Sequence, residues 1–538
     1  MPNTIKFNAN TEANALRVGK WHIGVRDVSK GPTSLTGFYN GINPPSSGYT
    51  IYQNKASQGP SIICPSSDDD LIVITNGIAD ASYTTINECF TYFAEQSDKM
   101  VMNTPIGEMV TNGCNIMMDP SNILSWPGSG TILYDLSGNA NNTTLYNGAA
   151  VNSDGFLELD GVDDYGQITN NSTLQGWAHS QSLAMWLYHD IQSGRRNPWD
   201  QAYGGYGTWT HEGGAQISQY FGNSGANSQP YVGYSSADVP ENKWTLMTTV
   251  RGTSDTTGHK WYRNGELTYT RSNPYGVLEV TNANPRIGRG YAGYWAGRMG
   301  KIMTWESELT DSDVKALWYG GYIVTDDLSF SINAGVLGSF EPGTTTANSQ
   351  IGTVTGTLTN GVGFNSSSGG YWEFDGVDDQ ITLSTNINLG NGNIAWTVSA
   401  WVKSTTTVNG LGQGSVASND GSGPVYSMMG INSGKMVYWT YQSSAWAQKL
   451  GVATVNDGDW HLLTWVNYSD TTMDMYVDGV FDKNVTNSTS GNNNPIDTIG
   501  NSWAARFNGE IAALHIYSKS LTAEEITQNY NANVNLYN

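Results

Sequence analysis

The stretch LELDGVDDY, residues 157–165, decides the fold, because it returns almost unchanged as WEFDGVDDQ, residues 372–380. The interval between the copies, measured from Asp160 to Asp375, is 215 residues. An ordered series of such matches with a small drift indicates a duplicated domain whose loops differ in length. Further pairs keep nearly this interval: Trp186 with Trp401, Trp244 with Trp460, Asn264-Gly265 with Asp478-Gly479, and Gly297 with Gly509.

Each copy opens with a strand that has one buried face. Leu157 and Leu159 alternate with Glu158 and Asp160, and the second copy repeats this pattern with aromatic residues in the apolar places. A period of two is typical of a half-buried strand. The Asp-Gly pair that follows predicts a turn directly after the strand.

The later part of each copy predicts a hairpin and then one short helix. Asn264-Gly265 and Asp478-Gly479 supply the positive φ angles that two-residue hairpin turns require. Thr310 and Thr522 are each followed three residues later by an acid, which is the pattern of a helix N-terminal capping box. Many strands and one terminal helix in roughly 200 residues predict a β-sandwich or jelly roll.

Together these pieces resemble the laminin-G-like, concanavalin A-like lectin/glucanase jelly roll. The residues that carry the resemblance are the Asp-Gly-Val-Asp-Asp turn, a later Trp-His/Thr-Leu strand, the Tyr-x-Asn/Asp-Gly hairpin and the closing Leu-Thr-x-x-Glu/Asp. The resemblance covers residues 111–322 and 323–538. It implies a mainly β chain with two tandem concanavalin A-like sandwiches, preceded by a small α+β module at 1–110.

The N-terminal 110 residues do not repeat. Residues 15–18, 21–25 and 71–75 read as strands, and 84–94 has the 3- and 4-residue apolar spacing of an amphipathic helix. Other short stretches resemble the head segment that precedes such domains in structural proteins of marine tailed bacteriophages, which implies that this module attaches the chain to other virion proteins. These stretches are 36–45, 48–52, 55–60 and, inside the first repeat, 135–139.

Composition limits the partners. The chain has 538 residues, about enough for three domains, and a formal net charge of −22. That charge argues against nucleic acid and anionic lipid, and indicates either solubility in salt water or a surface that collects divalent cations. The longest apolar run, residues 71–74, is too short to span a membrane, and we expect no membrane insertion.

Location is predicted from two further features of the sequence. No secretion signal is visible at residues 1–10, which favours a virion protein assembled in the host cytoplasm and displayed on the virion surface. An extracellular location is the alternative. Cys64, Cys89 and Cys114 are odd in number and lack Cys-x-x-Cys spacing, which favours buried thiols in a reducing compartment over disulfides or a metal site.

The paired acids of the repeat raise the question of catalysis. Glu158 with Asp160, and Glu373 with Asp375, place two carboxylates on one face of a strand, as the jelly-roll glucanases of this superfamily do. Those enzymes carry Glu-x-Asp-x-x-Glu, whereas the last acid here is Asp. We therefore expect no enzyme, with a glycan hydrolase that uses one Glu/Asp pair as the alternative.

The acidic turns also offer oxygen ligands for a cation. Laminin-G-like domains often hold calcium at the rim of the sandwich, so the resemblance implies calcium as a cofactor. The candidate ligands are Asp163, Asp164, Asp378 and Asp379. The alternative is a simple Asp-rich turn, since calcium takes six to eight oxygen ligands.

Aromatic residues on Gly-rich stretches are candidate platforms for sugars. The alternative is that these rings pack against the sandwich or against a neighbouring subunit. We expect a virion structural protein, a capsid-surface decoration or a tail or fibre appendage, that binds cell-surface glycans or holds subunits together in a homo-oligomer; a secreted cellular adhesin is a further alternative. The candidate carbohydrate-binding residues are Trp199, Tyr203, Tyr206, Trp209, Trp439, Tyr441 and Trp446.

Overall fold

The computed structural model divides into two compact units, Met1–Asp98 and Lys99–Asn538. It describes the backbone of six strands between residues 15 and 83, and residues 113–537 with gaps. No helix in this described part of the chain is long and apolar enough to cross a membrane. The gaps are 191–193, 202–206, 213–215, 221–232, 254–257, 272–276, 279–280, 391–392, 407–413, 420–426, 443–444, 470–471, 487–494 and 503–504.

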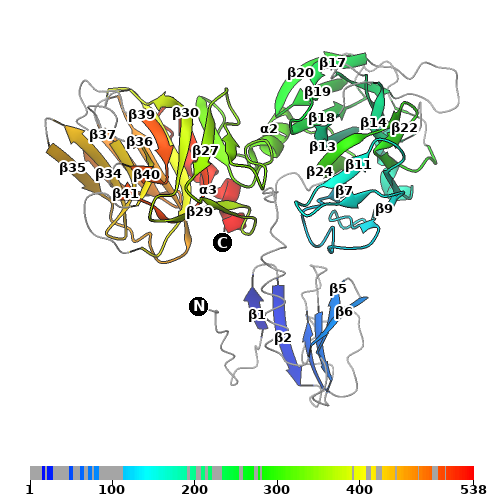
Figure 1. Ribbon diagram of the computed structural model, residues 1–538, viewed down its shortest axis with the longest axis horizontal. Helices are drawn as coiled ribbons and strands as arrows, with labels where there is room; N and C mark the ends of the chain where they lie inside the picture. Colours follow the sequence, from blue (N-terminus) through cyan, green and yellow to red (C-terminus); the bar gives the residue numbers. More distant parts are fainter. Residues whose placement is uncertain are drawn as a thin grey trace. The chain divides into compact units, whose positions relative to one another are not determined.

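The first unit contains one antiparallel sheet in which six strands follow each other in chain order (Figure 1). The strands predicted at 15–18, 21–25 and 71–75 are confirmed. The helix predicted at 84–94 lies outside the described residues. The strands are β1 (Ala15–Val18), β2 (Trp21–Asp27), β3 (Gly48–Tyr52), β4 (Ser61–Pro65), β5 (Leu71–Thr75) and β6 (Ile78–Tyr83).

The second unit begins with a sandwich of two sheets. One sheet has the order β10-β11-β24-β13-β18-β19-β20, with β7 beside β24, and the other has β17-β16-β15-β14-β21-β12-β9-β8. The strands are β7 (Cys114–Met118), β8 (Ile132–Leu133), β9 (Thr143–Tyr146), β10 (Ala150–Val151), β11 (Leu157–Asp160), β12 (Tyr165–Ile168), β13 (Gln181–His189), β14 (Arg196–Asp200), β15 (Thr208–His211), β16 (Gln216–Tyr220), β17 (Gly233–Asp238), β18 (Thr245–Arg251), β19 (His259–Arg263), β20 (Glu266–Arg271), β21 (Arg286–Ile287), β22 (Arg289–Gly290), β23 (Gly293–Tyr294) and β24 (Ala296–Trp305); the helices are η3 (Ser172–Leu174), η4 (Gly176–Ala178) and α2 (Asp311–Tyr319).

A second sandwich repeats this plan. Its sheets have the orders β28-β29-β42-β31-β36-β37-β38, with β25 beside β42, and β26-β27-β30-β39-β32-β33-β34-β35. Its elements are β25 (Leu328–Asn333), β26 (Thr346–Asn348), β27 (Thr355–Thr359), β28 (Gly363–Asn365), β29 (Tyr371–Asp375), β30 (Gln380–Asn388), β31 (Trp396–Lys403), β32 (Ser415–Ser418), β33 (Ser427–Asn432), β34 (Lys435–Gln442), β35 (Ala445–Leu450), β36 (Trp460–Asn467), β37 (Thr472–Val477), β38 (Val480–Thr486), β39 (Pro495–Ile499), β40 (Asn501–Ser502), β41 (Ala505–Arg506), β42 (Asn508–Tyr517) and α3 (Ala523–Tyr537).

The strand register confirms the duplication. Trp186 lies opposite Leu246 in the first sandwich, and Trp401 lies opposite Leu462 in the second. Trp186 is on β13, between β24 and β18, and Trp401 is on β31, between β42 and β36. The two sandwiches are therefore equivalent strand by strand, as the predicted repeat requires.

The predicted turn and cap are confirmed as well. Asn264 and Gly265 have φ of 51° and 81°, and Asp478 and Gly479 have 55° and 79°, as a type I′ hairpin turn requires. The Thr310 side chain accepts from the backbone N–H of Asp313, whose carboxylate accepts in return from the Thr310 N–H, so α2 begins with a full capping box.

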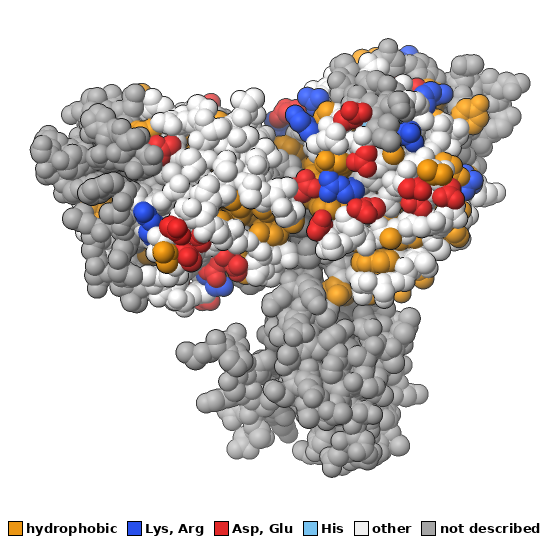
Figure 2. Space-filling model, in the orientation of Figure 1, with side chains coloured by type: hydrophobic (Ala, Val, Ile, Leu, Met, Phe, Trp, Pro, Cys, Tyr) orange, Lys and Arg blue, Asp and Glu red, His pale blue; other side chains and the backbone are white. Residues whose placement is uncertain are grey.

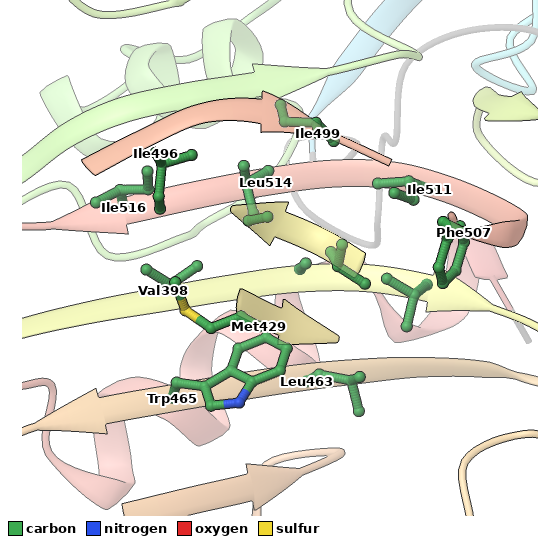
Figure 3. Close-up of a cluster of buried hydrophobic side chains, with 14 of the residues drawn as sticks. Val398, Met429, Leu463, Trp465, Ile496, Ile499, Phe507, Ile511, Leu514 and Ile516 are labelled. Atoms are coloured by element: carbon green, nitrogen blue, oxygen red, sulfur yellow. The ribbon is translucent and has the colours of Figure 1, made fainter. Parts of the chain in front are cut away.

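Apolar side chains from both sheets fill the second sandwich. Val398 and Leu463 point from one sheet, and Met429 and Ile499 point from the other, into one cluster (Figure 3). All four are buried. Burying each such side chain is worth about 1.5–3 kcal/mol, so this interior is the main source of stability for the frame that carries the loops.

A separate apolar cluster contains side chains of both sandwiches and joins them. Trp318 of α2 stacks on Trp186, with ring centroids 5.5 Å apart, and a Cβ added at Gly338 would overlap the Trp318 ring. The Trp318 Nε1 donates to the Gln350 carbonyl (3.3 Å), and the Gln350 amide donates back to the Trp318 carbonyl (2.6 Å). The junction is therefore packed and hydrogen-bonded.

His461 fastens two loops of the second sandwich. Its Nδ1 lies 2.8 Å from Asp478 in the β37–β38 turn, and its Nε2 lies 3.0 Å from Asp457 in the loop before β36. Burial alone would lower the pKa of His461, but the hydrogen bonds to Asp478 and Asp457 raise that pKa to about 9. The equivalent position of the first sandwich is Thr245.

We expect His461→Gln to destabilise the chain by about 1–2 kcal/mol near pH 6.5. The folded-state pKa is raised, so the stabilisation is fully present below the unfolded pKa of about 6.5 and is lost as the pH rises through about 9. Thermal unfolding of the native and variant chains between pH 6.5 and pH 10 checks this. A difference in unfolding midpoint between the native and variant chains that stays constant over that range would contradict this role of His461.

Candidate functional site

The carboxylate of Asp160 closes the acidic turn of the first sandwich. Its Oδ1 accepts from the backbone N–H of Val162 (2.8 Å) and of Asp163 (3.2 Å). Gly161 has φ of +73°, and a Cβ there would come within 2.6 Å of Ala296, so glycine is required at this corner. The backbone hydrogen bonds, led by that of Val162, lower the pKa of Asp160.

The same turn is built in the second sandwich. Asp375 Oδ1 accepts from the backbone N–H of Val377 (2.7 Å) and Asp378 (3.4 Å), and Gly376 has φ of +77°. The last acid of each turn folds back: Asp164 Oδ2 accepts from the Asp160 N–H (3.1 Å), and its equivalent makes the matching 2.9 Å bond. The motif is therefore a self-closed turn.

Residues distant in the chain hold each turn from outside. The Asn147 side chain donates to the Asp163 carbonyl (2.9 Å), and Asn360 donates to the Asp378 carbonyl (2.8 Å). Arg196 also donates to a carbonyl of the first turn, that of Gly161. Sequence reasoning missed these partners. The matching Asn-Gly pairs at 147–148 and 360–361 are the signal that could have found the asparagines.

Each turn brings three acids together. Asp160, Asp163 and Asp164 can each offer one oxygen so that all three lie within 4.8 Å of one another, and Asp375, Asp378 and Asp379 do the same. The structure thus unites the four predicted ligands as two sets and adds Asp160 and Asp375. An all-oxygen donor set of this kind suits calcium.

The second turn fits a cation better than the first. Asp379 is buried, and its Oδ1 has no hydrogen-bond partner. In the first turn a backbone hydrogen bond from Ala149 reaches Asp164. Burial, followed by the nearby charges of Asp375 and Asp378, raises the pKa of Asp379. A bound cation would satisfy the unpaired oxygen and relieve this repulsion.

The glutamates beside these turns lie on open strand faces. Glu158 is exposed and accepts from the Asn152 amide (2.7 Å), and it lies across from Arg298. Glu373 is exposed and lies directly across from Glu510. Burial raises the pKa of Glu510, Lys403 lowers it, and Glu373 raises it again. The carboxylate neighbour of Glu373 is thus Glu510, on another strand.

Two of the predicted sugar platforms are buried. Trp199 and Trp209 have no exposed surface and belong to the core of the first sandwich. Trp209 Nε1 donates to Thr249 of the opposite sheet (3.2 Å). This corrects the expectation of exposed rings: the alternation of β14 and β15 turns both indoles inward. Tyr203 and Tyr206 lie outside the described residues.

The candidates of the second sandwich gather on one stretch of sheet. Trp439 packs with Met428 and Val437, on the face of β34 opposite Met436 and Tyr438, which are in the core. Tyr441 follows two residues later, and its Cα pairs with Trp446 of β35. Trp439 is 8% exposed, which corrects the expectation of an exposed ring. The side chains of Tyr441 and Trp446 are outside the description.

Comparisons with known proteins give one family match. The family model described as the concanavalin A-like lectin/glucanases superfamily matches residues 160–315 and 375–527. No curated protein matches the chain.

Solved structures resemble the chain only distantly. The binding domain of botulinum neurotoxin DC in complex with rat synaptotagmin II is 11% identical with a TM-score of 0.35, covering 75% of this chain and 99% of that one. The same neurotoxin domain in complex with SialylT is 12% identical, with a TM-score of 0.34 and coverages of 75% and 98%. A Trypanosoma rangeli sialidase is 12% identical, with a TM-score of 0.31 and coverages of 56% and 52%. Likenesses this weak say nothing about function.

We expect millimolar calcium to raise the thermal midpoint of the chain by about 2–4 °C, as a ligand near tenfold its Kd would. Asp379→Asn should remove the larger part of this shift, because it takes a charge from the better-fitting turn. Calorimetry with calcium and with chelator checks this. The control is Asp154→Asn, an equal charge change at an exposed position outside both turns. An unchanged shift in Asp379→Asn would refute this site.

Proposed function

Because the chain belongs to the concanavalin A-like lectin/glucanase superfamily, we propose that its two lectin-like domains bind glycans without cleaving them. The observation that carries the proposal is the use of Asp160 and Asp375 as hydrogen-bond acceptors that close their own turns. Both acids thereby serve the fold, and they are the partners that a hydrolase would need beside Glu158 and Glu373.

Hydrolysis of a glycosidic bond asks for a proton donor with a raised pKa. Backbone hydrogen bonds lower the pKa of Asp160, which is the wrong direction for a general acid. Glu158 is exposed on its strand, so it lacks the apolar burial in which the general acids of such enzymes lie. These features support binding over cleavage in the first sandwich.

For the second sandwich we place glycan contact at β34 and β35. The backbone brings the positions of Trp439, Tyr441 and Trp446 to one stretch of sheet, and exposed Gln448 lies directly across from Trp439. Aromatic residues beside an amide are a recurring way to hold a sugar ring and its hydroxyl groups.

The proposal extends to the setting of the protein. We propose a virion structural protein, a surface decoration or fibre component, whose N-terminal unit attaches it to other virion proteins in a homo-oligomer. The support is the separate compact unit Met1–Asp98 and the resemblance of several of its stretches to the segment that precedes such domains in structural proteins of marine tailed bacteriophages. The lectin-like domains would then meet cell-surface glycans from the virion surface.

A glycan hydrolase is the second candidate, and one observation favours it. Glu373 and Glu510 are directly opposed on neighbouring strands, and burial raises the pKa of Glu510. Opposed residues in an antiparallel pair have Cβ atoms about 4.5–5.5 Å apart, which brings two carboxylates within the range of a retaining glycosidase. Lys403, 3.7 Å from Glu510, weakens the case because it favours the charged carboxylate.

Incubation with host surface polysaccharide and with β-glucans separates the two candidates. We expect retention of the chain on the polysaccharide and no new reducing ends, because the proposed sites bind without an acid/base pair. Reducing ends that disappear in Glu373→Gln/Glu510→Gln, but persist in the control Glu341→Gln, would establish the hydrolase and end the binding-only proposal.

Removal of residues 1–98 tests the virion role. The truncated chain keeps the whole second unit, so we expect it to fold and to bind polysaccharide as before. We also expect it to be missing from purified particles, which quantitative mass spectrometry can measure. Incorporation at the level of the full chain would place the attachment in the sandwiches instead.

A further inference from the structure

A row of stacked side chains crosses the outer face of the first sandwich. Tyr146 lies opposite Tyr165, and their rings stack with centroids 4.8 Å apart and planes at 12°. The Arg289 guanidinium lies 4.6 Å from the Tyr165 ring centroid and 5.5 Å from that of Tyr294. We call these four residues the tyrosine-arginine ladder.

The ladder faces away from the core. Leu145, which precedes Tyr146, is buried in the apolar cluster between the sheets. Gly166, which follows Tyr165 and pairs with Leu145, is buried as well. Tyr146 is 37% exposed, and the other three ladder residues are half-buried. Tyr291, in the same short β22–β23 hairpin, is 80% exposed. Solvent, and therefore a ligand, has access to this row.

The Arg289 guanidinium has N–H donors available for a ligand. In the described part of the chain, no ion pair within 4.0 Å involves Arg289. Arg286 lies 3.8 Å from the Asp200 carboxylate, whose charge Arg289 also stabilises from farther away. Stacking on tyrosine fixes the plane of a guanidinium and leaves its edge free. A fixed guanidinium edge matches the two oxygens of a carboxylate or sulfate.

The second sandwich shows that the fold does not require this arrangement. At the same register positions, Thr359 and Gln380 replace Tyr146 and Tyr165, and Asn501 and Arg506 replace Arg289 and Tyr294. These polar groups satisfy each other. The Asn501 amide donates to Gln380, and Arg506 donates to Asn501, to the Ser502 carbonyl (2.6 Å) and to the Val377 carbonyl (3.1 Å).

We propose that the tyrosine-arginine ladder binds an acidic saccharide, with its carboxylate or sulfate on Arg289 and a sugar ring against the tyrosines. This rests on the proposed glycan-binding function and names the ligand class for the first sandwich.

The overall charge makes this site selective. A chain of net charge −22 repels polyanions in general, and basic side chains lie among acidic ones on the face shown in Figure 2. A fixed donor and ring contacts that act together can offset this repulsion. The ladder provides both.

Dextran sulfate and unsubstituted dextran are the matched probes, measured against the full chain by biolayer interferometry. We expect dextran sulfate to bind and dextran to bind at least about 10-fold more weakly, because the charge-assisted contact is missing. Arg289→Gln should weaken dextran sulfate binding about 10-fold or more, and Tyr146→Ala, at the exposed edge, should weaken it as well. The control Arg263→Gln removes an equal charge from an exposed position on β19 and should leave binding unchanged.

Three results would overturn the ladder site. They are equal binding of polyglutamate and dextran sulfate, an equal loss in the Arg263 and Arg289 variants, or no binding of dextran sulfate at all. Circular dichroism of each variant excludes misfolding as the cause of a loss. Host polysaccharide binding is measured separately, so failure here with retention there would remove only the ladder and leave the proposed function standing.

Discussion

The carboxylate that closes each Asp-Gly-Val-Asp-Asp turn is the constraint from which the rest of the architecture follows. Asp160 and Asp375 end the strands β11 and β29, and each one holds the chain as it crosses from one sheet of its sandwich to the other. A wrong angle at this corner would misplace β12 or β30 on the opposite sheet. The motif survives in both copies because it is part of the frame, whereas the residues around it differ.

This corner explains how much the sequence could predict. Alternation, the Asp-Gly and Asn-Gly turns and the threonine caps are local, so the strands, hairpins and terminal helices were predictable from a few adjacent residues each. The equivalence of the Trp186 and Trp401 positions in the two sandwiches followed from the repeat alone. The grouping of Asp163 with Asp164 in one oxygen cluster was also local.

The candidate sites were less predictable because exposure and partners are properties of the packed molecule. Trp199 and Trp209 occur in a Gly-rich, aromatic stretch that reads as a surface loop, yet their strands turn both rings into the core. The opposition of Glu373 and Glu510 joins strands that are far apart in the chain. The tyrosine-arginine ladder likewise assembles from β9, β12, β22 and β23, and no short sequence motif predicts it.

The way the sandwiches cover their surfaces decides where ligands can bind. In the first sandwich, α2 and the start of the second sandwich cover the sheet that contains Trp186. In the second, Tyr537 at the end of α3 packs on Trp401, with ring centroids 4.7 Å apart, and covers the equivalent sheet. The ladder lies on the opposite sheet of the first sandwich, and the Trp439 stretch lies on the opposite sheet of the second. Tyr146 of the ladder is 37% exposed, whereas Trp439 is 8% exposed. The two copies have therefore kept the same covered sheet and have diverged in the residues of the other sheet.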